Sequence, residues 1–157
     1  MTRLLERYPA CKTASGHVAN PSTIALNSSG GLLNDGYALG HGLRRLGISA
    51  IVEPAATCAS SCAVTFLGGK RRIVRGSATV MFHAPYFKGQ NAYGERDISC
   101  DVGREALAEL NAYYLEMTDA ETGDRLFERT IWYCSADDGW VVKGASAAEL
   151  SGIATEK

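Results

Sequence analysis

Three short segments carry groups that could perform acyl transfer. Residues 58–62 have the sequence Cys-Ala-Ser-Ser-Cys, in which Ser60 precedes a small apolar run. His83 follows a later predicted strand, and a glycine pair, Gly30 and Gly31, follows an earlier one. A serine, a histidine and glycine N–H groups that can face an oxyanion are the parts of a serine hydrolase. One such N–H donor is worth about 3 to 4 kcal/mol in known cases.

Each of these features also has a common structural explanation. A serine at the start of a helix is usually an N-cap, which stabilises the helix by about 1 kcal/mol. A lone histidine at the end of a strand is more often a hydrogen-bonded structural residue, and Gly30 with Gly31 alone is an ordinary turn. The joint order of the segments along the chain, and not any one of them, favours the catalytic interpretation.

Length and composition indicate one compact domain. The chain has 157 residues, of which 46% are hydrophobic. A chain of this size buries about 70% of its unfolded surface, so it can fold without a metal or a disulfide. The 16 basic and 17 acidic residues nearly cancel, and the basic residues are dispersed, which argues against nucleic acid as a partner.

The distribution of apolar residues bears on location. No run of about 18 apolar residues exists, so no membrane-spanning segment is expected. Residues 1–7 are too polar to lead the apolar region of a signal peptide. The chain as written is therefore expected to be soluble and cytoplasmic, whereas a chain from which a signal segment had been removed would be periplasmic.

The five cysteines predict neither a metal site nor a disulfide framework. Their number is odd and no Cys-x2-Cys pair occurs, so no zinc site is expected, and nothing else in the sequence calls for a cofactor. Cys58 and Cys62 could face one another over a helical turn. The favoured interpretation is that both are small buried side chains.

Hydrophobic periodicity predicts alternating strands and helices. Strands are expected at residues 23–26, 48–53, 71–74, 78–82 and 140–142, the first of them buried. Helices are expected at residues 34–46, 61–67, 102–117, 124–133 and 145–150. Residues 86–94 are expected to form a loop over a site. The alternation predicts a layered α/β domain over residues 22–157, after a short irregular segment at residues 1–21.

In this order of segments the chain resembles the Clp protease proteolytic subunit and its crotonase-fold relatives. It is most similar to compact Clp-like proteins predicted to be periplasmic, whose signature resembles the Cys-Ala-Ser-x-Cys of residues 58–62. The similarity runs from about residue 24 to residue 153, in five ordered blocks. It implies a ClpP/crotonase-like α/β fold of layered ββα repeats that wind as a spiral, in a single domain with a long oligomerisation helix.

The resemblance also implies roles for individual residues. Ser60 takes the position of the nucleophile, with Ser61 as the alternate, and His83 takes that of the base. The backbone N–H groups of Gly31 and Ser61 would be the oxyanion donors.

The third member of the implied triad is a carboxylate. The family places an aspartate shortly before the last strand, where this chain has Asp137 and Asp138. Asp138 is the first candidate and Asp137 the alternate, and such a carboxylate would orient His83 and stabilise the imidazolium. In a Ser/Lys variant of the mechanism, Lys88 would be the nearest base.

The resemblance favours a serine peptidase that cleaves peptides or unfolded proteins without a cofactor. No Walker A pattern is present, so unfolding by ATP would need a separate ATPase. Relatives form trimers, hexamers or stacked rings through the helix at residues 102–117, where Tyr113 and Tyr114 are expected to be exposed for packing. The alternatives are a catalytically inactive ClpP-like oligomeric scaffold and a crotonase-type acyl-CoA enzyme.

Overall fold

The computed structural model describes residues 22–156, so the predicted segment at residues 1–21 lies outside it. The described chain divides into two compact units. The first comprises residues 22–80 and 142–156, and the second comprises residues 81–141. No helix among the described residues has both the length and the apolar character needed to cross a bilayer.

The first unit contains a parallel three-stranded sheet with the order β1-β2-β4. β1 (Thr23–Ala25) pairs with β2 (Ser49–Val52), and β2 pairs with β4 (Arg72–Val74). β2 is buried along its whole length, whereas β1 is exposed at the edge of the sheet. The expectation of a buried first strand is therefore wrong. Among the described residues β1 pairs with β2 alone, and its short apolar run does not reveal this edge position.

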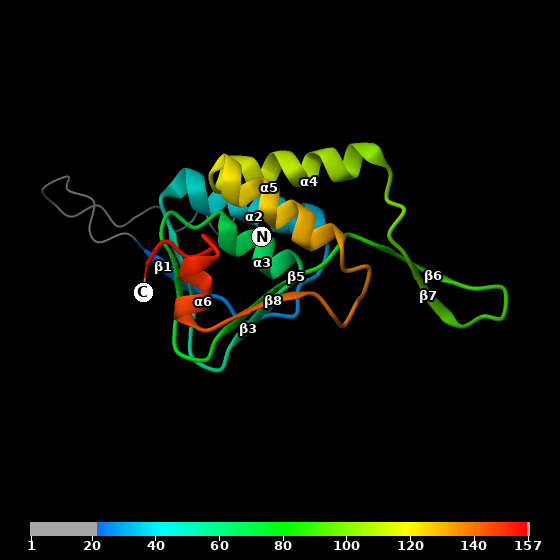
Figure 1. Cartoon of the computed structure of the whole chain (residues 1–157), viewed down its shortest axis with the longest axis horizontal. Coiled ribbons are helices and arrows are strands. Elements are labelled where there is room, and N and C mark those ends of the chain that lie inside the picture. Colours follow the sequence, from blue (N-terminus) through cyan, green and yellow to red (C-terminus); the bar gives the residue numbers. More distant parts are fainter. Residues whose placement is uncertain (1–21, 157) are drawn as a thin grey trace, which may run out of the picture. The chain divides into compact units, whose positions relative to one another are not determined.

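Two helices of the first unit, α2 (Leu33–Leu46) and α3 (Ser61–Leu67), pack against each other (Figure 1). α3 is buried throughout, as a short apolar helix must be. α2 ends at Gly47, whose φ of 66° is the left-handed conformation that commonly stops a helix. The Arg44 guanidinium of α2 donates hydrogen bonds to the carbonyls of Leu67 and Gly68, at 3.0 and 3.2 Å, and so caps the last turn of α3.

A second three-stranded sheet has the order β3-β5-β8. Its strands are β3 (Thr57–Ala59), β5 (Thr79–Phe82) and β8 (Trp140–Lys143), and the chain ends in α6 (Ala145–Leu150). β3 is not among the predicted strands, since three residues are too few to show a period. The other two strands and α6 lie where the hydrophobic pattern predicts them.

The second unit contains two helices and a hairpin. α4 (Arg104–Met117) and α5 (Ala120–Ile131) pack side by side. β6 (Phe87–Gln90) pairs antiparallel with β7 (Arg96–Ser99), and this hairpin extends away from the two helices (Figure 1).

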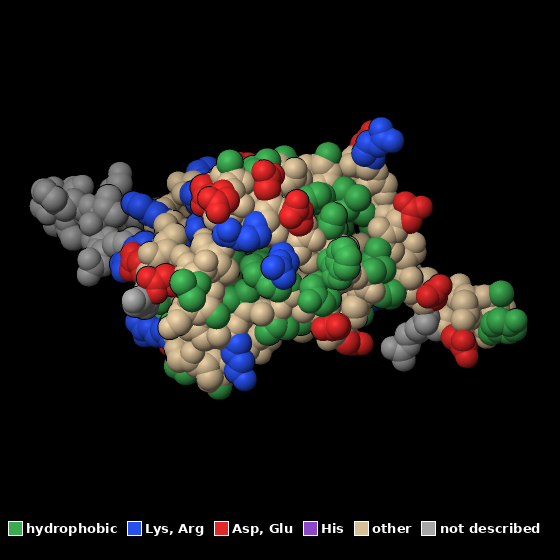
Figure 2. Space-filling view, in the orientation of Figure 1, with side chains coloured by type: hydrophobic (Ala, Val, Ile, Leu, Met, Phe, Trp, Pro, Cys, Tyr) green, Lys and Arg blue, Asp and Glu red, His purple; other side chains and the backbone are tan. Residues whose placement is uncertain are grey.

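The hairpin corrects the prediction of a loop at residues 86–94. Its turn is built on Asn91, whose side-chain oxygen accepts hydrogen bonds from the N–H groups of Tyr93 and Glu95, at 2.9 and 3.0 Å. β6 is exposed along its whole length, so its sequence lacks the apolar alternation that announces a half-buried strand. Figure 2 shows hydrophobic side chains at the tip, where Tyr93 is 89% exposed.

Tyr113 and Tyr114 of α4 are core residues, so the expectation that they are exposed is wrong. They are only 3% and 1% exposed. The Tyr114 ring packs edge-on against Phe82, with centroids 6.1 Å apart, and its hydroxyl lies 3.4 Å from Oγ1 of Thr130 in α5. These aromatic side chains therefore pack inside the chain, and α4 would use other residues in any contact between subunits.

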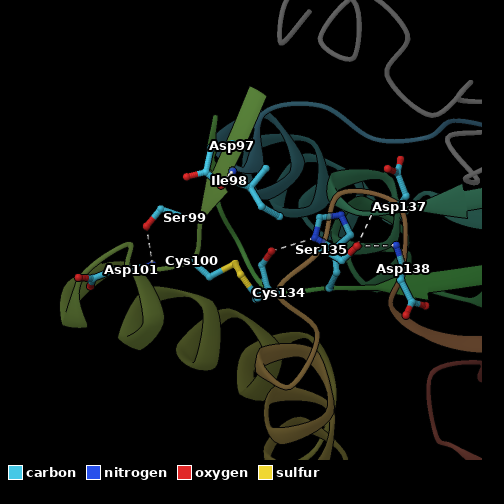
Figure 3. The surroundings of a disulfide bond; sticks show 11 residues. Asp97, Ile98, Ser99, Cys100, Asp101, Cys134, Ser135, Asp137 and Asp138 are labelled. Atoms are coloured by element: carbon cyan, nitrogen blue, oxygen red, sulfur yellow. Dashed lines mark hydrogen bonds between the residues drawn. A yellow bond between two sulfur atoms is a disulfide. The ribbon is translucent and has the colours of Figure 1, made fainter. Parts of the chain in front are cut away.

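Two disulfides correct the prediction of unpaired cysteines. Cys58 is joined to Cys62 in the first unit, and Cys100 is joined to Cys134 in the second (Figure 3). The Cα atoms of the two pairs are 5.2 and 5.8 Å apart, within the range that a disulfide requires. Cys58 and Cys62 are buried, as expected, but an odd total does not prevent four cysteines from pairing.

Candidate active site

Ser60 occupies the sharp turn between β3 and α3. Its φ of 58° and ψ of −128° place it in a region that residues with a side chain rarely adopt, and Ala55 is the other non-glycine residue in the described chain with a positive φ. The Ser60 side chain makes no capping hydrogen bond to α3. The N-cap explanation for this serine is therefore wrong. Such strained residues cost about 1 to 3 kcal/mol and cluster at functional sites, where the surroundings hold them in place.

The loop at residues 27–31, which carries Gly30 and Gly31, is hydrogen-bonded to β3, the strand that leads into this turn. Ser28 forms a parallel bridge with Cys58. The Ser28 N–H donates to the Thr57 carbonyl at 2.8 Å, and the Ala59 N–H donates to the Ser28 carbonyl at 2.9 Å. These backbone bonds place Gly30 beside Ser60 and Gly31 beside Ser61.

The two glycines of this loop face the serine turn. A β-carbon at Gly30 would lie 2.6 Å from Cβ of Ser60, and the φ of Gly30 is 105°, so only glycine fits there. A β-carbon at Gly31 would lie 3.7 Å from Oγ of Ser61. No hydrogen bond among residues 22–156 uses the N–H of Gly31 or of Ser61 as its donor. Both predicted oxyanion donors thus lie near Ser60 and are available to an acceptor.

Further contacts hold the serine turn from two sides. The Cys58–Cys62 disulfide brackets Ser60, and its two residues are 0% and 7% exposed. From α2, Gly36 approaches so closely that a β-carbon there would lie 2.8 Å from the Ser61 carbonyl oxygen. The unusual backbone of Ser60 is therefore enforced by covalent and packing contacts.

His83 follows β5 directly and is half-buried. Its Nδ1 lies 2.8 Å from the carbonyl oxygen of Ala84. A carbonyl oxygen can only accept, so the neutral ring carries its hydrogen on Nδ1 and keeps a lone pair on Nε2. A base that removes a proton from a serine needs this arrangement.

The two candidate aspartates lie in the turn that precedes β8. The Ser135 hydroxyl oxygen accepts hydrogen bonds from the N–H groups of Asp137 and Asp138, at 3.1 and 3.0 Å, and the two side chains point to opposite sides of the turn (Figure 3). Both aspartates are exposed, and Oδ1 of Asp138 accepts from the Gly139 N–H at 2.8 Å. Within the described chain no hydrogen bond joins either carboxylate to His83, so an orienting role for them stays a prediction.

The predicted site residues fall into two groups, one in each unit. The first unit holds Gly31, Ser60 and Ser61, and the second holds His83, Asp137 and Asp138. Two contacts of His83, with Ala84 and with the Tyr86 ring at a centroid distance of 5.4 Å, are not among the predictions. The position of both residues within three of the histidine is the signal that could have found them.

Metal ligation and one surface hollow also bear on ligand binding in the described part of the chain. It contains no group of three or more His, Cys, Asp or Glu residues that could hold a metal ion. A surface hollow of about 310 Å³ lies at the end of α5, lined by Glu128, Arg129, Trp132 and Tyr133. None of these four is a predicted site residue.

Comparison with known proteins gives structural matches. No protein-family model and no curated protein matches the chain. It is similar to 1510-N, a membrane-bound stomatin-specific protease solved as a lysine-to-alanine mutant with a substrate peptide, with a TM-score of 0.67 and 18% identity over 99% of this chain and 67% of that chain. It is also similar to an asparagine-to-aspartate mutant of ClpP1 from Listeria monocytogenes, with a TM-score of 0.64 and 17% identity over 99% of this chain and 80% of that chain.

These similarities establish the fold. The chain has a mixed α/β, ClpP-like fold, which confirms the predicted fold class. Both neighbours belong to a group of proteases with that fold. At this level of identity their substrates and assemblies remain properties of those proteins.

Proposed function

We propose that the chain is a ClpP-like serine peptidase. Ser60 attacks the carbonyl carbon of a peptide bond while His83 takes the hydroxyl proton. The N–H groups of Gly31 and Ser61 stabilise the oxyanion that forms. His83 then returns the proton to the leaving amine, and water releases the acyl group from Ser60 by the reverse roles.

The backbone of Ser60 is the observation that carries the proposal. The Ser60 side chain plays no part in capping α3. The residue is held at a φ of 58° by a buried disulfide and by Gly30, where no side chain fits. A turn of this kind between a strand and a helix exposes a nucleophile above its surroundings. A structural serine would gain nothing from it.

The histidine supports the same mechanism. The Ala84 carbonyl leaves Nε2 of His83 as the atom that can accept a proton. Asp138, with Asp137 as its alternate, is the predicted third member of the triad, but the proposed mechanism requires only Ser60, His83 and the two N–H groups. The hydrogen bonds of Asp138 are with Ser135 and Gly139 of its own turn, so the asparagine variants described below test whether either aspartate acts on His83.

The substrates proposed are peptides and unfolded proteins. One structural neighbour was solved with a substrate peptide, and the proposed chemistry suits the same class. By analogy with the fold's proteases we also propose a homo-oligomer, namely a trimer, a hexamer or a ring, with a separate ATPase where folded substrates must be opened. Among such proteins, we propose that the chain resembles the compact Clp-like group predicted to be periplasmic.

A fluorophosphonate probe tests the proposal. An activated serine displaces fluoride from the probe and keeps the phosphonyl group, which intact mass detects as one adduct. The variants are Ser60→Ala and His83→Ala, with Ser61→Ala as the matched neighbour and Lys88→Met as the test of a Ser/Lys mechanism. We expect one adduct on the wild type that Ser60→Ala and His83→Ala abolish and the other two variants keep.

Other outcomes select the alternatives. Loss of the adduct with Ser61→Ala alone would move the nucleophile to Ser61. Loss with Lys88→Met but not with His83→Ala would make Lys88 the base. A folded wild type without an adduct would overturn the peptidase proposal and favour the oligomeric scaffold or the acyl-CoA enzyme, which sedimentation and acyl-CoA binding would then separate.

A further inference from the structure

The contacts of His83 define how its ring is held. On the ring edge, Nδ1 donates its hydrogen to the Ala84 carbonyl at 2.8 Å. On the ring face, the Tyr86 side chain lies at a centroid distance of 5.4 Å and an interplanar angle of 34°. The edge contact selects the tautomer and the face contact restricts rotation of the imidazole, and these are the two tasks that a triad carboxylate performs.

The edge contact comes from a peptide group that is itself fixed. Ala84 is only 4% exposed, and its N–H donates to the Tyr133 carbonyl at 2.8 Å. Tyr133 immediately precedes Cys134, which the second disulfide joins to Cys100. The carbonyl that orients His83 is therefore attached to a cross-linked part of the chain.

The face contact is also built from more than one side chain. Tyr86 is half-buried, and the Lys88 ammonium lies 5.9 Å from the centroid of its ring. An aromatic ring attracts a cation near its face, so Lys88 helps to hold Tyr86.

The candidate carboxylates have other partners. Oδ1 of Asp138 is engaged by the Gly139 N–H, and Asp137 is exposed with its side chain on the opposite side of the turn (Figure 3). The Nδ1 position of His83, where a triad carboxylate would bind, is already taken by Ala84.

We propose that the Ala84 carbonyl and the Tyr86 ring position the catalytic histidine, and that no carboxylate among residues 22–156 does so. The inference rests on the proposed function and deepens it, since it replaces the predicted Asp138 by a backbone acceptor and an aromatic residue. Ala84 and Tyr86 are positioning residues: they act through His83 and touch no reacting atom.

The rate of fluorophosphonate labelling tests the positioning. Tyr86→Leu removes the ring and should slow labelling roughly 3- to 10-fold, the range that an aromatic pair is worth. Tyr86→Phe keeps the ring and should restore the rate. Tyr93→Leu, at the 89% exposed tyrosine of the hairpin tip, is the matched control and should leave the rate unchanged.

Asparagine variants test the carboxylates directly. Asp137→Asn and Asp138→Asn should each label within about 2-fold of the wild type. A triad carboxylate would instead produce a loss of about 10,000-fold, the effect of that replacement in a serine protease triad. Such a loss at either position, or a Tyr86→Leu rate equal to that of the wild type, would overturn the inference.

The nitrogen spectrum of the imidazole separates this inference from the proposed function. In ¹⁵N-labelled protein at alkaline pH, the signals that disappear in His83→Gln should show a protonated Nδ1 and an unprotonated Nε2, unchanged by Asp138→Asn. The reverse tautomer would overturn the inference even if labelling succeeds. A wild type that the fluorophosphonate probe does not modify would overturn the peptidase function, and with it the catalytic role of His83. The nitrogen spectrum would still confirm or refute the hydrogen bond between Nδ1 and the Ala84 carbonyl.

Discussion

The turn around Ser60 and the segment around His83 are held in different ways. Ser60 lies between a buried disulfide and a glycine whose missing side chain is a steric necessity. His83 is held by one carbonyl and one half-buried ring, next to a hairpin whose first strand is exposed along its whole length. The serine side is over-determined by packing, whereas the histidine side depends on a few local contacts.

This difference predicts how each side responds to change. A protein interior is close-packed, so a change in volume beside Ser60 must disturb the fold. A substitution beside His83, such as one at the half-buried Tyr86, leaves room that solvent can fill. It should therefore alter the rate of the reaction more than the stability of the fold. The four predictions below test this contrast, from the largest expected effect to the smallest.

Gly30→Ala should be the most damaging substitution. The new β-carbon would lie 2.6 Å from Cβ of Ser60 and 2.7 Å from the Ala59 carbonyl, at a φ of 105°. Overpacking and a strained backbone, each worth up to about 3 kcal/mol, should together lower the free energy of unfolding by about 5 kcal/mol. Urea unfolding measures this loss, and labelling of Ser60 should disappear.

Gly89→Ala in β6 is the control for that substitution. A β-carbon at Gly89 meets nothing within 4 Å, so its stability should stay within about 0.5 kcal/mol of the wild type. If Gly30→Ala behaved like Gly89→Ala, the turn around Ser60 would not be held as tightly as the structure indicates.

Removal of the second disulfide should have the next largest effect. Cys100 and Cys134 are separated by 34 residues, and closing a loop of that size stabilises the fold by about 4 kcal/mol in the chain-entropy account. Cys100→Ala with Cys134→Ala should therefore lower the free energy of unfolding by about that amount. For Cys58 and Cys62, which are 4 residues apart, the same account gives about 2 kcal/mol. If removing this shorter loop's disulfide lowered the free energy of unfolding by more than removing the longer loop's, the ranking would be contradicted.

The two disulfides should also differ in their response to a mild reductant. Cys134 is exposed and Cys100 half-buried, whereas Cys58 and Cys62 are 0% and 7% exposed. A thiolate must reach a sulfur atom to break the bond, so the bond between Cys100 and Cys134 should open first in the folded protein. Alkylation followed by peptide mass analysis measures the order, and in denaturant both should be reduced. Equal rates in the folded state would show that the serine turn opens readily.

The mildest expected effect concerns the start of α5, in the unit that carries His83. The Thr122 N–H donates to the Asp119 carboxylate at 2.9 Å and lowers the pKa of this carboxyl below its usual value. Because the pKa is lower in the folded state, the hydrogen bond stabilises the protein fully at pH values above the ordinary aspartate pKa of about 3.9. This stabilisation is lost as the pH falls through the pKa of Asp119 in the folded protein. Asp119→Ala should therefore destabilise the protein at neutral pH and lose most of that effect in strongly acidic solution.

Asp124→Ala is the matched control on the same helix. Asp124 is exposed and caps nothing, so its replacement should change stability little at any pH. Thermal unfolding of both variants and the wild type across the acid range measures the difference. An Asp119→Ala effect that did not fade on acidification would assign the stabilisation to something other than the ionised cap.

The helices could be predicted because their signals are local. The prediction of residues 34–46 differs from the observed α2 by one residue, and the prediction of residues 145–150 coincides with α6. α5 begins at Ala120, four residues before the predicted start at residue 124, because the capping role of Asp119 was not recognised. Apolar spacing and a terminal glycine act within one element, so they are visible in a single segment of sequence.

The exposure of single residues could not be predicted in the same way. Tyr114 packs against Phe82 and α5, and β1 lies at the edge of its sheet. In both cases the exposure of the residue depends on which segment, distant in sequence, packs against it. An aromatic residue on a helix stripe serves a core and an interface equally well, so the sequence alone leaves both open.

The sequence by itself determined the order of the segments, the serine and histidine with their glycine pair, and a ClpP-like fold class that the structural similarities confirm. Only the tertiary structure decided that Ser60 adopts a φ of 58°, that Gly30 lies against it and that Cys58 bonds to Cys62. Residue types and their order are properties of the chain, and so sequence reveals them. A strained backbone, as at Ser60, and a close contact, as between Gly30 and Ser60, arise only when segments far apart in sequence pack together. The reason is that packing supplies the free energy that holds a residue in a conformation it would otherwise leave.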